Sequence, residues 1–294
     1  MAYILKNKNL EIEIDLPFEN YNFSRFDWTG KIVAVKFQNI LLTSPETNKP
    51  LDKNEIGKGF YNEFGIETAL GFEEAAIGGW FHKIGVGLLK KEDPQYQFGK
   101  SYKVKPGRFK VTSKSNSLSI SCESQTVSGY AYLLEKEIQL NNSGFQVNYH
   151  LKNTGDKDIL TDEYGHNFIA INKDLIGKSY RLKFPFQLKP ALFNETVNPE
   201  QKIILRENEI TFTNTLEKEF FFSNLSGNES VAASWELLNL LHNIGISEKT
   251  SFKTRKINLW GGKHVISPEL FFHIFLEPNQ SKRWSRTYSI YKLS

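Results

Sequence analysis

Cysteine and methionine are almost absent from this sequence, which contains one of each among 294 residues. A single cysteine cannot form an internal disulfide, and it excludes a metal site built from several cysteines. Cys122 lies in the alternating segment 118–123, where a small buried side chain is more common than a nucleophile. The cysteine content therefore points to no cysteine-based metal site and no thiol chemistry.

Blocks of like charge and long apolar runs are also missing. The 37 basic and 33 acidic residues are mixed along the chain and give a net charge of +4, so we expect no nucleic-acid-binding surface. No apolar run reaches the roughly 18 residues that a membrane-spanning helix needs. Residues 1–8 lack the apolar core of a signal peptide. We therefore expect a cytoplasmic protein that binds neither nucleic acid nor membranes and is a monomer or a weak homodimer.

Helical periodicity is scarce, whereas apolar and polar residues alternate repeatedly. Residues 10–16 and 31–37 alternate as half-buried strands do, and an aromatic content of 14% favours strands further. Residues 135–140 and 145–151, joined by the turn 141–144, predict a β-hairpin. The remaining strand candidates are residues 102–104, 109–113, 118–123, 130–140, 145–152, 180–188, 202–205, 210–212 and 220–222.

Short strands separated by turns predict an all-β protein, a large antiparallel β-sandwich with few short helices. We find no linker and no repeat, so we expect residues 1–294 to form a single domain. The secondary structure of segment 230–245 stays open between helix and strand. Val231, Trp235, Leu238 and Leu241 have helical spacing, while the surrounding strands favour a further strand.

A polar cluster stands at the start of an apolar strand in residues 161–171. It places a carboxylate, a phenol, an imidazole and an amide close together, with His166 and Asn167 at its centre. A β scaffold can present a site at such a point, although a strand edge with one hydrogen-bonded core histidine has the same pattern. Both interpretations remain open from this segment alone.

Arg25 and Asp27 lie where a polar loop leads into the strand 31–37. If this piece is extended, both side chains share one face while Phe26 and Trp28 take the other. The two charged residues could form a structural ion pair. The alternative is a pair that faces a ligand.

Segment 39–79 shows little alternation and is predicted to be a long covering loop, with a helical turn possible within 62–76 that carries Glu73. After it, the glycine-rich segment 78–87 places His82 and Lys83 beside glycines that permit close approach of the backbone. The alternative for these two residues is a bend with a solvated lysine.

Glu269 begins a very apolar strand after Ser267 and Pro268. A carboxylate in such a place tends to be partly desolvated, which raises its pKa toward the range of a useful base. Trp260, Trp28 or Trp80 could offer a ring on which a ligand stacks.

Several of these segments resemble motifs of the galactose mutarotase-like proteins, the aldose 1-epimerase superfamily. Five pieces of that pattern recur in order across nearly the whole chain, and the likeness is greater to a bacterial branch than to the galactose enzymes. The pieces are residues 24–30, 81–88, 151–155, 161–168 and 259–269. The resemblance implies a β-supersandwich with a sugar-binding cleft and an enzyme that interconverts the α and β anomers of an aldose. No cofactor is implied.

The resemblance also implies roles for single residues. His166 corresponds to the acid that protonates the ring oxygen, Glu269 to the base that removes the anomeric hydroxyl proton, and Arg25 to a group that binds sugar hydroxyls. The family's second histidine follows a different glycine pattern from that around His82, so His82 and Lys83 are both binding candidates. We add Asp27, Glu73, Asn167 and Trp260 as binding candidates.

Three alternative functions would give the same residues other roles. A non-catalytic carbohydrate-binding protein could use this scaffold, because a fold does not fix a function. An isomerase or lyase acting on a modified sugar could use Lys83 to bind a carboxylate or phosphate. A glycoside hydrolase would need a second carboxylate to pair with Glu269; the sequence shows no obvious partner and leaves only Glu73 or Glu163 open for that role.

Overall fold

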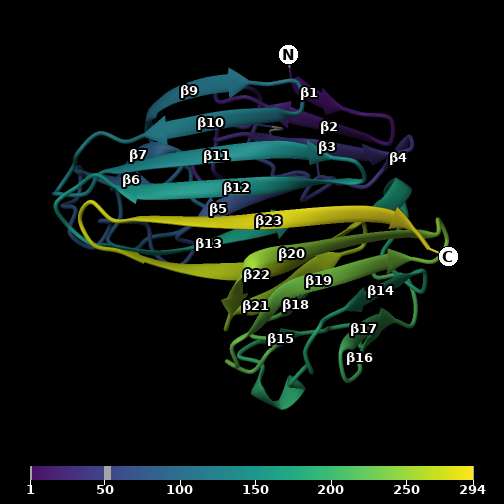
Figure 1. Cartoon of the computed structure of the whole chain (residues 1–294). Coiled ribbons are helices and arrows are strands. Elements are labelled where there is room, and N and C mark those ends of the chain that lie inside the picture. The colour runs from purple at the N-terminus through teal and green to yellow at the C-terminus, as the bar shows by residue number, and fades with distance from the viewer. Residues whose placement is uncertain (1, 50–53, 294) are drawn as a thin grey trace.

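The structure of the protein is a computed structural model that describes residues 2–49 and 54–293. Antiparallel strands dominate it, and they form two large sheets and one small sheet (Figure 1). Helix within the described ranges is limited to two 3₁₀ turns, η1 (Ile171–Lys173) and η2 (Pro190–Leu192). The predicted all-β antiparallel architecture with few short helices is confirmed.

The first sheet carries the N-terminal strands and the polar cluster. Its order is β1-β2-β3-β5-β13-β22-β21-β18-β15, and β4 pairs with β3. The strands are β1 (Tyr3–Lys6), β2 (Leu10–Asp15), β3 (Lys31–Phe37), β4 (Ile40–Leu41), β5 (Phe60–Phe64), β13 (Ile159–Asn167), β15 (Thr196–Val197), β18 (Phe220–Phe222), β21 (Ile257–Gly262) and β22 (Val265–Leu276).

The second sheet has the order β16-β17-β14-β19-β20-β23-β12-β11-β10-β9. Its strands are β9 (Arg108–Ser113), β10 (Ser117–Glu123), β11 (Tyr132–Asn141), β12 (Gly144–Asn153), β14 (Tyr180–Lys183), β16 (Ile203–Leu205), β17 (Glu209–Phe212), β19 (Val231–Asn239), β20 (Ile244–Thr254) and β23 (Ser281–Lys292). The small sheet consists of β6 (Trp80–Lys83), β7 (Gly87–Lys90) and β8 (Val104–Pro106).

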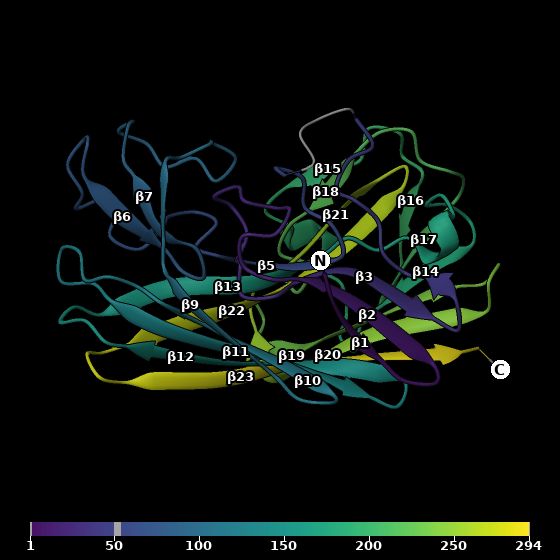
Figure 2. The same cartoon turned by 90° about the horizontal axis from the view of Figure 1, so that it is seen from above.

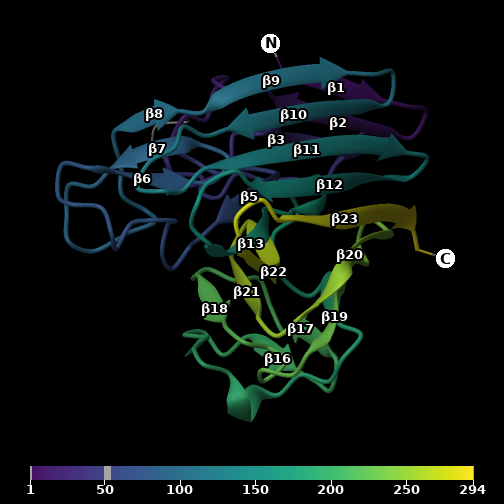
Figure 3. The ribbon, with the colours of Figure 1, turned by 60° about the vertical axis from the view of Figure 1, so that its left-hand side comes forward.

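The two large sheets stack face to face, and the small sheet lies on the side of the first sheet that faces away from β10, β11 and β12 (Figure 2). Figure 3 shows the small sheet to the left of β5, with β16, β17 and β18 near the bottom of the view. Alternate residues of the strands fill the space between the large sheets. Ile12, Leu134, Ile138 and Val147 are examples and are almost fully buried, as expected for sandwich packing.

The predicted hairpin is confirmed as β11 and β12, which pair from Tyr132 with Asn153 to Asn141 with Gly144. Segment 230–245 is resolved as strand. Its residues form β19, a turn and the start of β20, and β19 pairs on both sides, with β14 and with β20. Backbone hydrogen bonds to two neighbours outweigh the helical spacing of the apolar side chains.

Segment 39–79 is not one long loop, which corrects the prediction. It contains β4 and β5, and β5 is a central strand whose five residues are all buried. A strand buried on both faces has no alternation to detect. The possible helical turn within 62–76 is a series of hydrogen-bonded turns that follows β5. Residues 50–53 of this segment lie outside the described residues.

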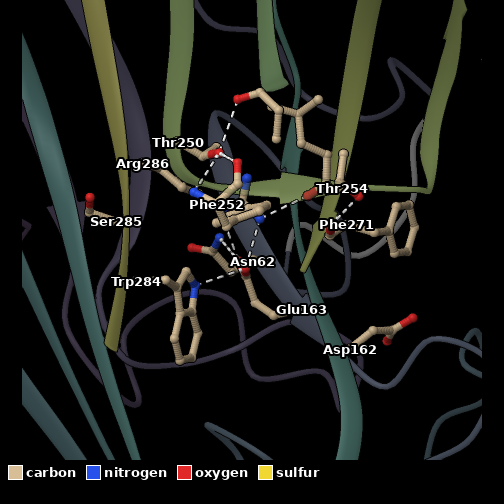
Figure 4. A network of polar contacts seen from close by, with 12 residues as sticks. Asn62, Asp162, Glu163, Thr250, Phe252, Thr254, Phe271, Trp284, Ser285 and Arg286 are labelled. Carbon is tan, nitrogen blue, oxygen red and sulfur yellow. Dashed lines mark hydrogen bonds and ion pairs between the residues drawn. The ribbon is translucent and has the colours of Figure 1, made fainter. Parts of the chain in front are cut away.

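Buried polar side chains join the two large sheets behind β13. Arg286 of β23 donates to both carboxylate oxygens of Glu163, at 2.7 and 3.1 Å, and to Glu248 at 2.6 Å. Asn62 and Trp284 also donate to Glu163, and Figure 4 shows them beside it. Every one of these charges is fully buried and paired. The network fixes β13 against the second sheet, so the opposite face of β13 is presented in a defined position.

Candidate active site

The outer face of the first sheet carries a cleft over β13, β22 and β21. Tyr164 of β13 pairs with Phe271 of β22, and continuing this antiparallel register places His166 opposite Glu269. The two side chains meet, with Nε2 of His166 at 3.5 Å from Oε1 of Glu269. Their side chains are only 5% and 6% exposed. The register of two adjacent strands thus produces the contact between the two proposed catalytic residues.

His166 is held on every side. Its Nδ1 lies 2.8 Å from the hydroxyl of Ser267, which also accepts a hydrogen bond from the backbone N–H of Asn167 at 3.0 Å. The imidazole stacks on Phe168 with ring centres 4.0 Å apart, and Trp260 meets it edge-on at 5.4 Å. These contacts leave Nε2 directed at Glu269, so the ring is oriented before any ligand arrives.

Burial favours the neutral form of both groups. It raises the pKa of Glu269 to about 8, although the nearby positive charge of Arg25 opposes this shift. It lowers the pKa of His166 well below its usual value, and Arg25 lowers it further. The raised pKa of Glu269 agrees with the desolvation expected from its place in an apolar strand. Around neutral pH the pair therefore carries one proton. A second proton would charge the imidazole, and loss of the one proton would charge the carboxyl group.

Arg25 points into the same cleft from the loop that precedes β3. Its Nε donates to Glu63 at 2.9 Å, its Nη1 to Glu46 at 2.9 Å, and its Nη2 to the hydroxyl of Tyr164 at 3.3 Å. The guanidinium has more N–H groups than these three bonds use. The remaining donors are available for a ligand, and the bonds to Glu63 and Glu46 fix their direction.

Glu63 lies beneath Arg25 on β5 and is fully buried. It accepts from Tyr164 at 2.7 Å and from Nζ of Lys83 at 3.1 Å, and Lys83 also donates to Tyr96 at 2.8 Å and to the carbonyl of Gly65 at 3.3 Å. Burial alone would raise the pKa of Glu63, but Lys83 and Arg25 outweigh it and hold the pKa below its usual value. Glu63 is therefore a buried anion that anchors the arginine.

The cleft above these groups has a volume of about 710 Å³, within the usual range for a small-molecule site. Arg25, Tyr164, His166, Trp260 and Glu269 all line it. The structure thus brings together four of the residues selected from the sequence, Arg25, His166, Trp260 and Glu269. Their individual roles remain proposals.

The structure corrects the prediction that Asp27 and Asn167 bind a ligand, because both side chains point into the protein. Asp27 is 1% exposed, accepts hydrogen bonds from the backbone and hydroxyl of Thr29, and pairs with Lys136 at 3.1 Å. Asn167 follows His166 on the strand and so takes its other face, where it bonds Glu248 and Tyr288. Both residues stabilise the interior and neither lines the cleft.

The prediction that His82 and Glu73 bind a ligand is also corrected. His82 is fully buried between Tyr130 and Tyr132, and burial lowers its pKa to about 4. Glu73 lies exposed in the turns after β5. Neither residue lines the cleft.

Lys83 and Glu163 are buried rather than presented to a ligand. The ammonium of Lys83 has three N–H donors, and Glu63, Tyr96 and Gly65 accept them. No donor is left for a carboxylate or phosphate of a substrate. Glu163 belongs to the network between the sheets, so neither Glu163 nor Glu73 can pair with Glu269 as a glycoside hydrolase requires.

Three residues of the site were missed by sequence reasoning. Tyr164 was detectable, because it lies two positions before His166 on a strand and shares its face. Ser267 stands two positions before Glu269 on the same face of β22, so it was detectable for the same reason. Glu63 gave no signal, because its strand lies in a segment without alternation and its partners are distant in sequence.

Comparison with known proteins identifies the fold. No protein-family profile matches the chain, and no curated protein matches it in sequence. Solved structures do match. A galactose mutarotase-like protein from Lactobacillus casei has a TM-score of 0.63 at 11% identity, over 99% of this chain and 100% of the other. A galactose mutarotase-like protein from Clostridium acetobutylicum has a TM-score of 0.63 at 12% identity, over 99% and 95%.

A GalM/aldose epimerase homologue from C. elegans has a TM-score of 0.61 at 13% identity, and the match covers 100% of both chains. These likenesses define the class: the chain has the galactose mutarotase-like fold, as the sequence motifs implied. At such low identity the comparisons carry the fold and not the activity. Within the part of the chain that the structure describes, no helix combines the length and the apolar character needed to span a membrane.

Proposed function

We propose that this protein is an aldose 1-epimerase-like enzyme that interconverts the α and β anomers of a reducing sugar. One observation carries the proposal: the 3.5 Å contact between Nε2 of His166 and Oε1 of Glu269 at the base of the cleft. Anomerisation needs an acid and a base that act on two oxygens bonded to the same carbon. A carboxyl group and an imidazole in contact can reach both oxygens at once.

Ring opening moves one proton from the anomeric hydroxyl to the ring oxygen. Glu269 as carboxylate removes the hydroxyl proton, the anomeric carbon becomes a carbonyl carbon, its bond to the ring oxygen breaks, and protonated His166 supplies the proton to that oxygen. Rotation about the bond next to the aldehyde followed by the reverse steps gives the other anomer. The pair holds one proton before and after each step. Each positioned proton-transfer group contributes on the order of 10²- to 10⁴-fold.

Arg25 and Trp260 would hold the sugar in place. The free N–H groups of Arg25 would donate to sugar hydroxyls, and the indole ring of Trp260 would pack against a face of the pyranose. Glu63 and Lys83 would act through Arg25 as positioning residues. The same cleft suits a non-catalytic sugar-binding protein, the second candidate, since burial favours neutral His166 and Glu269 over the charged pair that acts as acid and base.

The experiment is anomer exchange measured by NMR on a panel of reducing sugars at equilibrium, with and without the protein. We expect faster exchange for at least one sugar. His166→Gln and Glu269→Gln should each remove most of that acceleration while the protein stays folded, as checked by circular dichroism. Exchange rates that are the same in both variants as in the unmodified protein would refute the proposed function. Binding without acceleration would establish the carbohydrate-binding alternative.

A further inference from the structure

A second hollow of about 660 Å³ continues the cleft beyond the acid–base pair. The two hollows share part of their lining, namely Ile66, Phe98, Glu195, Phe221 and Asn258. The shared residues make the two hollows immediate neighbours, so one elongated ligand could contact both. The second hollow does not reach His166 or Glu269. Its place is therefore that of a binding subsite, to one side of the reaction centre.

Aromatic rings lead from the first hollow into the second. Trp260 of β21 lies in the first hollow, and its cross-strand partner Phe221 of β18 lines both hollows. Phe98 also lines both hollows, and the guanidinium of Arg25 lies over its ring at 4.7 Å. Rings placed along a path favour a ligand with flat, partly apolar faces, which a sugar ring presents through its C–H groups.

Unused polar groups line the second hollow. The side chains of Asn228 and Arg255 form no hydrogen bond or ion pair with any residue that the structure describes. An amide donates and accepts hydrogen bonds, which suits hydroxyl groups that also do both. The charges that line this hollow balance in number, because two cations, Arg255 and Lys256, are matched by two carboxylates, Glu67 and Glu195. Lys256 is in addition tied to Glu67. A neutral polyhydroxyl ligand fits this lining better than an anion.

We propose that the second hollow binds a further sugar unit, so that the substrate is a reducing disaccharide or a longer saccharide whose reducing end reaches His166 and Glu269. This inference rests on the proposed function for the reaction at the reducing end. It adds a subsite and a substrate class. Binding energy from a remote sugar unit can improve turnover of the reducing end, because it holds that end in position.

Two measurements on the intact protein separate this inference from the proposed function. The dissociation constants of maltose, cellobiose, lactose and melibiose are compared with those of glucose, galactose and glucose 6-phosphate by isothermal titration calorimetry. Anomer exchange of the same sugars is followed by NMR. We expect at least one disaccharide to bind about tenfold or more tightly than its reducing-end monosaccharide.

A matched pair of variants tests the location of the subsite. Asn228 and Asn279 both have a φ of +67°, a conformation that glycine adopts freely. Asn228 lines the second hollow, whereas Asn279 lies exposed in the turn between β22 and β23. Asn228→Gly should weaken disaccharide binding about threefold to tenfold. Asn279→Gly makes the same chemical change away from the cleft and should leave that binding unchanged.

Each result decides one point. Equal affinity for disaccharides and monosaccharides overturns the subsite and leaves the proposed function intact if exchange is accelerated. Tighter binding of glucose 6-phosphate than of every disaccharide also overturns it, because the hollow is then an anion site. Tighter disaccharide binding without faster exchange supports the subsite and refutes the proposed reaction. Equal losses in Asn228→Gly and Asn279→Gly would exclude the second hollow as the place where the additional sugar binds.

Discussion

The hydroxyl of Ser267 lies 2.8 Å from Nδ1 of His166, and both residues are buried. Ser267 stands on β22 two positions before Glu269, so one strand supplies both the partner of the imidazole and the carboxyl group that faces it. This arrangement couples the orientation of the proposed acid to the position of the proposed base.

Removal of that hydroxyl should loosen the imidazole. Ser267→Ala leaves Nδ1 of His166 and the N–H of Asn167 without a partner, so we expect a loss of stability of about 1–3 kcal/mol and exchange about tenfold slower. The ¹⁵N chemical shifts of His166 should show a changed balance of the two neutral forms. Ser267→Thr keeps the hydroxyl and is the control. An unchanged ¹⁵N spectrum in Ser267→Ala would show that Ser267 does not orient the ring.

The pH dependence of the reaction follows from the proton that His166 and Glu269 share. The pKa of Glu269 is raised to about 8, so above this pH the pair loses its only proton. The pKa of His166 is lowered well below its usual value, so only in acid does the pair gain a second proton. We expect kcat/KM to form a plateau around neutral pH and to fall as the pH rises through about 8. A rate that rises steadily from pH 7 to pH 9.5 would contradict a shared proton.

The burial that raises the pKa of Glu269 should also make the folded protein less stable as the pH rises. The unfolded chain releases this proton near pH 4.5, whereas the folded protein keeps it until about pH 8. Between these values the folded state binds more protons than the unfolded state, so the stability it gains from the protonated carboxyl is lost as the pH rises. Glu269→Gln removes the titration. The free energy of unfolding of this variant, measured by chemical denaturation, should exceed that of the unmodified protein increasingly from pH 5 to pH 8, with a difference on the order of a few kcal/mol at pH 8.

Lys83 should act through Glu63 on Arg25. Lys83→Met leaves the fully buried carboxylate of Glu63 without its ammonium partner, which we expect to cost about 3–5 kcal/mol of stability and to raise KM through a misplaced Arg25. The double variant Lys83→Met with Glu63→Gln removes both charges and should recover part of that stability. Thermal unfolding and sugar titration measure the two effects. If the double variant is less stable than Lys83→Met alone, the pair does not act as proposed.

Arg286 should be essential to the joint between the two large sheets. It is fully buried and pairs with Glu163 and Glu248, so Arg286→Met leaves two buried carboxylates short of a cation and should cost about 3–5 kcal/mol. Arg283 lies on the same strand but is exposed. Arg283→Met is the matched control and should change stability by less than about 0.5 kcal/mol. Chemical denaturation of both variants provides the comparison.

Local patterns in the sequence carried much of the architecture. Alternation in residues 10–16 and the turn 141–144 predicted strands and a hairpin that the structure contains. They did so because the side chains of a strand point to alternate faces. The polar cluster around His166 and the carboxyl group of Glu269 were identified for the same reason, since each interrupts an otherwise apolar strand. Single-domain organisation and a cytoplasmic location remain predictions.

Other features depended on contacts between residues far apart in the chain. The alternation of β13 places Asn167 and His166 on opposite faces, but only the stacking of the sheets decides which face is the cleft. The anion Glu63 meets Arg25 and Tyr164, which are 38 and 101 positions away, and no local pattern records such a meeting. The strand at residues 231–239 likewise depends on its two neighbours. Thus the sequence by itself determined the strand chemistry and singled out His166 and Glu269 as the proposed acid–base pair. Only the tertiary structure decided their 3.5 Å contact, the anchoring of Arg25 and the second hollow, because register and sheet packing set these distances.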